Sequence, residues 1–365
     1  MNIELLTLSE VVDVSGSKGN FSVAVKRHPR YIDVQKCIAC GSCAEKCPRK
    51  VGDEFDIGQS KRKAAYIKFG QTVPLKYAID AESCIYLNKG KCRACEKFCP
   101  TQAINFEEVE QSTVIQVGSI IISTGFKTYD PSGVDLYNHD AVPDIVTSME
   151  FERLLSSSGP CMGHLLKPSD NREPAKIAWI QCVGSRDTNR CGNAYCSGVC
   201  CMYAIKQAQV TPEHLEENEP EETIFYMDMR TQGKEFERYL EEAKSQGIKF
   251  LRARPHSLLP GPSYVGVNMQ YFTEKGELKE EYFDMVVLSV GMELEESSKR
   301  LAENMGIELN EYSFAKTSSF EPVSSSVDGV YVSGAFVGPK SIPSAVTEAS
   351  TAAVEAAKDL LPAKN

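Results

Sequence analysis

The arrangement of cysteines constrains this 365-residue chain more than any other feature, because eight of its 14 cysteines fall in two blocks. The first block is CIACGSCAEKCP at residues 37–48, and the second runs from Cys84 to the CRACEKFCP of residues 92–100. Two-residue gaps let thiolates converge on one cluster, and a fourth cysteine before proline ligates the other cluster of a two-cluster ferredoxin. Zinc sites use C-x2-C pairs instead. Neither free thiols nor disulfides would explain why each of the two blocks ends in Cys-Pro. The spacing therefore predicts two 4Fe–4S clusters.

The rule that the fourth cysteine crosses over assigns the eight ligands. One cluster is expected on Cys37, Cys40, Cys43 and Cys99, and the other on Cys84, Cys92, Cys95 and Cys47. The second block departs from the usual spacing, because residues 85–91 separate its first two cysteines. We expect a Gly-containing loop at residues 88–91 to bulge out there. That loop is either a solvated loop or a basic surface for an acidic redox partner.

The other six cysteines predict a further metal site. They are Cys161, Cys182, Cys191, Cys196, Cys200 and Cys201. A third 4Fe–4S cluster is expected on Cys182, Cys196, Cys200 and Cys201, with Cys191 as the reserve ligand and a set of packed thiols as the alternative. Cys196 and Cys200 are four residues apart, which would place them on one side of a helix. Cys161 is expected to be a small buried hydrophobic residue without a role.

Hydrophobic patterning predicts an α/β protein with a parallel sheet into which the ferredoxin block is inserted. A capping box at Thr147 and Glu150 predicts a helix over 151–155. Strands are expected at 3–6, 21–25, 31–33, 77–80, 113–125, 177–180, 223–227, 248–251, 283–290 and 329–332, and helices after Cys196, at 233–246 and at 344–360. The domain boundaries that follow are a ferredoxin domain at 31–108, an α/β domain with the third cluster at 148–285, and a partial FAD-binding domain from 1–30, 109–147 and 286–365.

Composition excludes several function classes. A net charge of −10 gives no indication of a nucleic-acid surface. The apolar runs fall short of the roughly 20 residues that a membrane span needs. The N-terminal residues carry Glu4 and Glu10 and no basic segment, so no signal peptide and a cytoplasmic location are expected. The five histidines are scattered, and no Ser/His/Asp constellation is present.

Several further motifs, taken in order with both cysteine blocks, carry a family resemblance. They are IISTGF at 121–126, IQCVGSRD at 180–187, CSGVCCMYAIKQA at 196–208 and VYVSGAFVGPKSIPSAVTEAS at 330–350. The chain resembles the A-subunit of heterodisulfide reductase over nearly its whole length. The resemblance implies a thioredoxin-reductase-like flavoprotein that binds FAD, with an inserted two-cluster ferredoxin and an additional cluster near the flavin. It also implies flavin-based electron bifurcation or confurcation, and related subunits occur in benzoyl-CoA reductase assemblies.

The same resemblance implies residues around the flavin. Gly334, Lys340, Ile342 and Ser344 would line it, and Thr124 and Gly125 would close its ribityl or pyrophosphate side. Unpaired N–H groups at the start of the last helix would stabilise the negative charge of a reduced flavin; the alternative is an ordinary Gly/Pro turn before a packing helix. Lys206 resembles a family lysine near the flavin N5, the catalytic candidate, and is otherwise a solvent-exposed helix lysine.

The sequence departs from the family at the flavin fold. No G-x-G-x-x-G motif, which holds the FAD pyrophosphate, occurs in the chain. After the strand at 177–180 only Gly184 remains of the usual glycines, so no nicotinamide site is expected there. We therefore predict an incomplete two-dinucleotide-domain flavoprotein of the α/β class with an inserted α+β two-cluster ferredoxin domain. Part of its flavin fold would be missing, truncated or supplied by another polypeptide.

Three functions are compatible with these observations. The first is an electron-transfer subunit that shares FAD with another chain and has other iron–sulfur and flavin subunits as partners. The second is an iron–sulfur wiring subunit without its own flavin. The third is a self-sufficient flavin reductase, against which the missing pyrophosphate motif argues.

Overall fold

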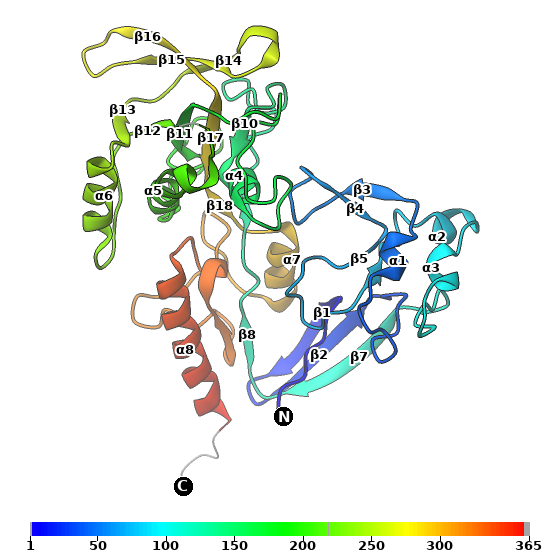
Figure 1. Cartoon of the computed structure of the whole chain (residues 1–365). Coiled ribbons are helices and arrows are strands. Elements are labelled where there is room, and N and C mark those ends of the chain that lie inside the picture. The colour runs from blue at the N-terminus through cyan, green and yellow to red at the C-terminus, as the bar shows by residue number, and fades with distance from the viewer. Residues whose placement is uncertain (1, 218, 361–365) are drawn as a thin grey trace. The chain divides into compact units, whose positions relative to one another are not determined.

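The computed structural model describes residues 2–217 and 219–360, and the chain divides into two compact units (Figure 1). Unit 1 comprises residues up to 16 together with 21–117, and unit 2 comprises 17–20 and the residues from 118 onward. This division does not test the domain boundaries expected at residues 30/31 and 108/109, which stay predictions. None of the described helices is long and apolar enough to cross a membrane.

Unit 1 consists of one three-stranded antiparallel sheet and a series of very short elements. Its elements are β1 (Ser9–Ser17), β2 (Asn20–Arg27), α1 (Ser42–Glu45), β3 (Lys50–Gly52), β4 (Lys61–Lys63), β5 (Ala65–Tyr66), β6 (Ala78–Ile79), α2 (Ile85–Lys89), α3 (Ala94–Lys97) and β7 (Gln111–Val117). The sheet has the order β1-β2-β7, and β3 pairs with β4 and β5 with β6. Buried cysteines, Ile32, Ile79 and Phe106 belong to the same core.

Unit 2 is built on parallel strands. Its elements are β8 (Ile120–Ile122), β9 (Lys127–Thr128), β10 (Ile145–Thr147), α4 (Ser148–Leu155), β11 (Lys176–Val183), α5 (Cys200–Val210), η1 (Thr211–His214), β12 (Glu221–Tyr226), α6 (Phe236–Ser245), β13 (Lys249–Arg252), β14 (Ser257–Pro260), η2 (Pro262–Tyr264), β15 (Val267–Phe272), β16 (Leu278–Phe283), β17 (Met285–Val290), β18 (Met292–Glu293), α7 (Glu296–Met305), β19 (Val330–Val332), η3 (Gly334–Phe336) and α8 (Ile342–Asp359). The main sheet has the order β10-β17-β11-β12-β13, with every pair parallel. A second, two-stranded parallel pair joins β8 to β19.

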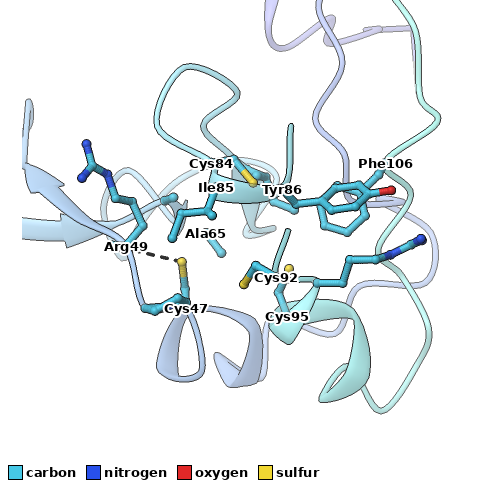
Figure 2. A pocket seen from close by; sticks show the side chains of 13 residues that line it. Cys47, Arg49, Ala65, Cys84, Ile85, Tyr86, Cys92, Cys95 and Phe106 are labelled. Atoms are coloured by element: carbon cyan, nitrogen blue, oxygen red, sulfur yellow. Dashed lines mark hydrogen bonds between the residues drawn. The ribbon is translucent and has the colours of Figure 1, made fainter. Parts of the chain in front are cut away.

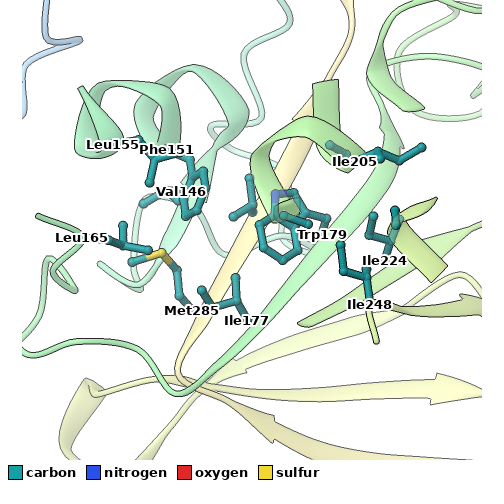
Figure 3. Close-up of a cluster of buried hydrophobic side chains, with 14 of the residues drawn as sticks. Val146, Phe151, Leu155, Leu165, Ile177, Trp179, Ile205, Ile224, Ile248 and Met285 are labelled. Carbon is teal, nitrogen blue, oxygen red and sulfur yellow. The ribbon is translucent and has the colours of Figure 1, made fainter. Parts of the chain in front are cut away.

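Both faces of the main sheet are covered, which explains why its central strands are almost continuously apolar. On one face Ile177 and Trp179 of β11 pack with Phe151 of α4 and Ile205 of α5 (Figure 3). On the other face Ile180 belongs to a core that includes side chains of the antiparallel sheet β14-β15-β16. The parallel α/β arrangement predicted from the sequence is thus confirmed.

The capping box is also confirmed. The Glu150 amide donates to Thr147 Oγ1 at 3.3 Å, and the Thr147 amide donates to Glu150 Oε2 at 2.6 Å. These two bonds satisfy donors that the first turn of α4 would otherwise leave unpaired.

Several expected elements are wrong. Residues 3–6 form no strand, because their apolar side chains are largely exposed and β1 instead pairs with β2 through a tight turn at Gly19, whose φ is +85°. The single strand expected over 113–125 is divided into β7 and β8 around Gly118. A Cβ at Gly118 would lie 2.3 Å from the Leu360 side chain, which would then have to shift.

The loop expected at 88–91 is wrong in its first two residues, because α2 occupies residues 85–89. The Asn88 side-chain amide donates to the carbonyls of Ala81, Glu82 and Cys84, which ties the helix to the turn before it. Gly90 ends the helix in the left-handed conformation, with φ 66°. The strands β14–β16 and the helix α7 have no counterpart among the sequence-based expectations.

Glu222 of β12 makes the stability of unit 2 depend on pH. This side chain is 7% exposed, and its Oε1 has no hydrogen-bond partner among the described residues. Burial raises its pKa to about 8. Because the folded-state pKa lies above the unfolded value of about 4.3, the stability linked to Glu222 is fully present below that value and is lost as the pH rises through about 8.

We therefore expect Glu222→Gln to be more stable than the wild type above pH 8 by roughly 1–3 kcal/mol, with the difference shrinking toward low pH. Anaerobic urea unfolding, followed by the fluorescence of the single tryptophan, Trp179, measures this. Glu221→Gln is the matched control, because the exposed Glu221 carboxylate pairs with Lys249 at 2.6 Å. Parallel pH profiles for wild type and Glu222→Gln would contradict the expectation.

Candidate functional site

The first cysteine pocket of unit 1 contains four thiols from both blocks. Its walls include Cys37, Cys40, Cys43 and Cys99, and it encloses about 300 Å³ of empty space, part of it open to solvent. Cys43 lies on α1, which begins after Gly41 in the left-handed conformation. A Cβ at Gly41 would lie 3.2 Å from the Tyr77 hydroxyl of the same pocket, so glycine lets the cysteine loop approach this wall.

The second cysteine pocket contains the remaining four thiols of the two blocks. Cys47, Cys84, Cys92 and Cys95 line it, around about 340 Å³ of empty space that is also partly open. Figure 2 shows their sulfurs around one space, with the apolar side chains of Ile85, Tyr86 and Phe106 beside them. The structure therefore groups the eight cysteines in the two crossed sets that the spacing predicts. Their role as ligands stays a prediction.

Backbone amides are already directed at several of these sulfurs. The amide of Ala39 donates to Cys37 Sγ at 3.5 Å, and that of Ala103 donates to Cys99 Sγ at 3.2 Å. Such bonds stabilise negative charge on a ligand sulfur and influence the reduction potential of a cluster. Burial raises the pKa of Cys43 to about 11, so this thiol must release its proton when a metal binds.

The donor set fits a cluster better than it fits a single ion. Among the described residues, no group of three or more His, Cys, Asp or Glu side chains is arranged to hold one metal ion. An iron–sulfur cubane has sulfides and several irons between its ligands, so its four cysteine sulfurs lie farther apart than those around a single ion. The structure provides two separate pockets with four cysteines each.

A third group of cysteines lies in unit 2, where β11 ends and α5 begins. Cys182 belongs to the end of β11, and Cys200 and Cys201 open α5. Cys182, Cys196 and Cys201 each raise the pKa of Cys200, after burial as the main cause, so the four sulfurs are electrostatic neighbours. In parallel sheets the carboxyl ends of strands are the usual place of binding sites.

One expectation for this group is wrong: Cys196 does not share a helix with Cys200. The helix α5 begins only at Cys200, and Gly198 before it has a φ of +72°, which helical backbone does not allow. Two amides nonetheless donate to sulfurs of the group, Gly198 to Cys196 Sγ at 3.3 Å and Arg230 to Cys201 Sγ at 3.4 Å.

The two other cysteines lie elsewhere. The Cys191 thiol donates to the Asp187 carbonyl at 3.1 Å, and its charged neighbours are Asp187 and Glu293 rather than cysteines. Cys161 is partly buried and packs against the core of Figure 3. Neither geometry suggests a place in the third group.

A pocket of unit 2 encloses about 1200 Å³ of empty space, part of it open to solvent, and we call it the unit 2 pocket. Four of the residues expected around a flavin, Gly125, Gly334, Lys340 and Ile342, line it. Thr124 and Ser344, which were also expected there, are not among its lining residues. Lys206 is not among them either, and its side chain is exposed on α5.

Lys340 does not point freely into this pocket. Its ammonium lies 2.5 Å from Glu348 Oε1, and the amide of Gly334 donates to Glu348 Oε2 at 3.0 Å. The Glu348 carboxylate of α8 thus binds both the Lys340 ammonium and the backbone of the turn at Gly334. Nothing in the sequence motifs singled out Glu348.

The residue that joins this pocket to the third cysteine group is Tyr203, which sequence reasoning missed. It lines the pocket, and its hydroxyl donates to the Val290 carbonyl at 2.8 Å and accepts from Ser148 Oγ at 3.2 Å. The Cys200 thiol lies 3.6 Å from the same Val290 carbonyl. In the sequence, only the position of Tyr203 about one helical turn after Cys200 could have indicated this role.

Comparisons with known proteins concern the first cysteine block and the chain as a whole. Residues 30–51 match the family model of a 4Fe-4S binding domain. The A-subunit of the "H(2):CoB-CoM heterodisulfide,ferredoxin reductase" of Methanothermobacter thermautotrophicus is 40% identical over 359 residues, 98% of this chain and 53% of that protein. The iron-sulfur A-subunit of the "CoB--CoM heterodisulfide reductase" of Methanocaldococcus jannaschii is 39% identical over 356 residues, 96% of this chain and 53% of that protein.

The chain spans about half the length of the curated relatives it matches. Among solved structures, the thioredoxin reductase of T. acidophilum covers 69% of this chain, with 70% of its own length aligned, a TM-score of 0.44 and 19% identity. That of Lactococcus lactis covers 81%, with 85% of its own length aligned, the same TM-score and 15% identity. The family resemblance predicted from the motifs is confirmed by the curated relatives.

Gly291, directly after β17, permits the close approach of two loop residues, Ser185 and Ser197. A Cβ there would lie 2.3 Å from Ser185 Oγ and 2.7 Å from Ser197 Oγ, two buried hydroxyls that are hydrogen-bonded at 2.6 Å. We expect Gly291→Ala to destabilise unit 2 by roughly 1–3 kcal/mol through overpacking, measured by urea unfolding of Trp179 fluorescence. The added substitution Ser185→Ala should recover part of this loss; a neutral Gly291→Ala would contradict the packing argument.

Proposed function

We propose that this chain, a relative of the heterodisulfide reductase A-subunit along nearly its whole length, is an electron-transfer subunit of a multisubunit oxidoreductase. It would hold three 4Fe–4S clusters and, together with another chain, FAD. Clusters of this kind transfer single electrons and a flavin exchanges one or two, so the combination suits conversion between two-electron and one-electron transfer. Flavin-based electron bifurcation, which the family resemblance implies, would be one use of it.

The observation that carries this proposal is the crossed distribution of eight cysteines over two pockets. Cys47 contributes to the pocket of the second block, and Cys99 contributes to that of the first. Two clusters with exchanged ligands lie close together, which favours electron transfer between them. The protein supplies the thiolates, the amide donors and a partly apolar surrounding.

The third cysteine group and the unit 2 pocket support the flavin part of the proposal. Tyr203 lines the pocket and is hydrogen-bonded to the carbonyl of Val290, which also lies beside Cys200. A cofactor in this pocket would therefore lie near a cluster on Cys182, Cys196, Cys200 and Cys201. The pocket is mainly lined by backbone and apolar side chains, as sites for flat aromatic rings are.

Two observations support a further chain that completes the FAD site. The pair β8–β19 is a parallel sheet of only two strands, whereas parallel sheets are normally larger and covered on both faces. Ile342 and Val346 at the start of α8 are 81% and 60% exposed. We propose that a partner brings the missing strands and the glycine-rich pyrophosphate loop to this region, and that Lys206 lies near the flavin N5 in the complete site.

A second candidate is an iron–sulfur wiring subunit without its own flavin. The absence of any G-x-G-x-x-G motif favours it. The two candidates differ in the flavin content of the purified complex.

The iron content tests the three-cluster proposal. Anaerobically purified wild-type chain should contain about twelve irons, four per cluster. Cys182→Ser and Cys200→Ser should each lower this to about eight, because each removes a ligand of one cluster only. Cys191→Ser and Cys161→Ser are matched controls, since these cysteines lie outside the group, and should keep the wild-type content. A wild-type content of about eight irons would remove the third cluster.

The flavin proposal is tested by filling the unit 2 pocket. Ala345 lines this pocket on the first turn of α8, whereas Val354, farther along the same helix, does not and is 55% exposed. In the purified complex, Ala345→Trp should lower the flavin-to-iron ratio at least about tenfold, the loss that 1.4 kcal/mol produces, because the indole occupies the space of the ring. Val354→Trp should leave it unchanged. Wild-type complex without flavin, or equal ratios in both variants, would contradict flavin binding here.

A further inference from the structure

Unit 1 contains a third pocket that has no cysteine in its walls. Three cationic side chains line it, those of Arg30, Lys68 and Lys76, together with Thr7, Thr72 and the ring of Tyr66. It encloses about 560 Å³ of empty space, part of it open to solvent. Neither the electron-transfer function nor the comparisons assign a role to this pocket.

The cations of this pocket lack carboxylate partners. Within the described part of the chain, no carboxylate forms an ion pair with Arg30, Lys68 or Lys76. Arg30 is only 8% exposed, and its guanidinium donates to the Thr7 hydroxyl at 2.9 Å. Burial and the charge of Arg27 lower its pKa, and the opposite effect of the Glu108 carboxylate does not offset them.

Arg62 in the same unit shows how a buried arginine is normally accommodated. It is 9% exposed, close to the value for Arg30, and is paired with the carboxylates of Glu54 and Asp80, the latter at 3.1 Å. Because burying a charge is costly unless it is paired, the unpaired guanidinium of Arg30 indicates that an anion is missing from its pocket.

The hydrogen-bonding groups of the pocket point to the same conclusion. Thr72 Oγ1 is buried without a hydrogen-bond partner among the described residues. The Lys76 ammonium donates to the Cys37 carbonyl, a neutral acceptor, and keeps further donors for a ligand. Lys68 lies on the exposed side of the pocket.

We propose that this pocket binds a phosphate group, free or as part of a small phosphorylated molecule. A guanidinium, two ammonium groups and a hydroxyl converge there from different elements, which suits a tetrahedral oxyanion with several acceptor oxygens better than a planar carboxylate. The Arg30 guanidinium supplies the buried contact, Thr72 Oγ1 gains its missing partner, and Lys68 closes the open side. The pocket does not depend on the flavin or on the third cysteine group.

Isothermal titration of the anaerobic, cluster-containing chain with inorganic phosphate, in a phosphate-free buffer, tests the proposal. One phosphate should bind per chain, and acetate should bind at least about tenfold more weakly. Lys68→Gln and Thr72→Val should each weaken phosphate binding at least about tenfold, because hydrogen bonds to charged groups contribute about 1.5–3 kcal/mol. Both changes leave the buried Arg30 in place, so folding is retained, as unchanged iron content will verify.

Lys61→Gln is the matched control, because Lys61 is an exposed lysine of β4 outside the pocket. It should leave the affinity unchanged. The proposal is overturned if the wild type shows no saturable binding up to about 10 mM phosphate, if acetate binds equally well, or if Lys68→Gln and Lys61→Gln have the same effect. Tighter binding of phosphorylated molecules than of inorganic phosphate would support the larger ligand.

Discussion

The convergence of eight cysteines on two pockets is the constraint on which unit 1 depends. Apart from the sheet β1-β2-β7, its helices have four or five residues and its strands two or three. Elements this short cannot form a stable core by themselves. Four of the buried residues of its core are cysteines, so ligand binding and folding are expected to be coupled. Left-handed turns at Gly41, before α1, and at Gly90, after α2, let the chain bring these cysteines together.

In unit 2 the cysteines are brought together by the edge of a parallel sheet rather than by short turns. Its parallel sheet is covered on both faces, which leaves the carboxyl ends of β11 and β17 as the accessible edge. Cys182 lies at the end of β11 and Val290 at the end of β17. The helix α5 adds Cys200, Cys201 and Tyr203. A cysteine group and a large pocket therefore share one edge of the sheet. This proximity, rather than any single motif, is what suits the unit to electron exchange between two kinds of cofactor.

The grouping of the cysteines and the position of the strands were predictable, because cysteine spacing and hydrophobic periodicity each reflect local covalent or packing geometry. These patterns predicted the crossed sets and four of the five strands of the main sheet, whereas β10 was not expected. The helix α2 was missed because Gly90 suggested a loop, although glycine also ends helices. The strands β14–β16 were missed because they pair with one another outside the α/β pattern.

The unit 2 pocket was only partly predictable. Gly125, Gly334, Lys340 and Ile342 came from a family motif, whereas Tyr203 and Glu348 act through contacts across the fold that no spacing reveals. Lys206 shows the converse: a family position alone did not place it at the pocket wall. The pairing of Arg62 and the isolation of Arg30 likewise became visible only when their neighbours were known.

The central claim is that these sulfurs bind iron in clusters, and X-ray absorption at the iron edge of the anaerobically purified chain tests it most directly. The account predicts iron surrounded by sulfur, with a second shell of iron at the short separation typical of cubanes. Iron bound by oxygen and nitrogen without neighbouring iron, or a chain free of iron whose thiols are joined in disulfides, would contradict it.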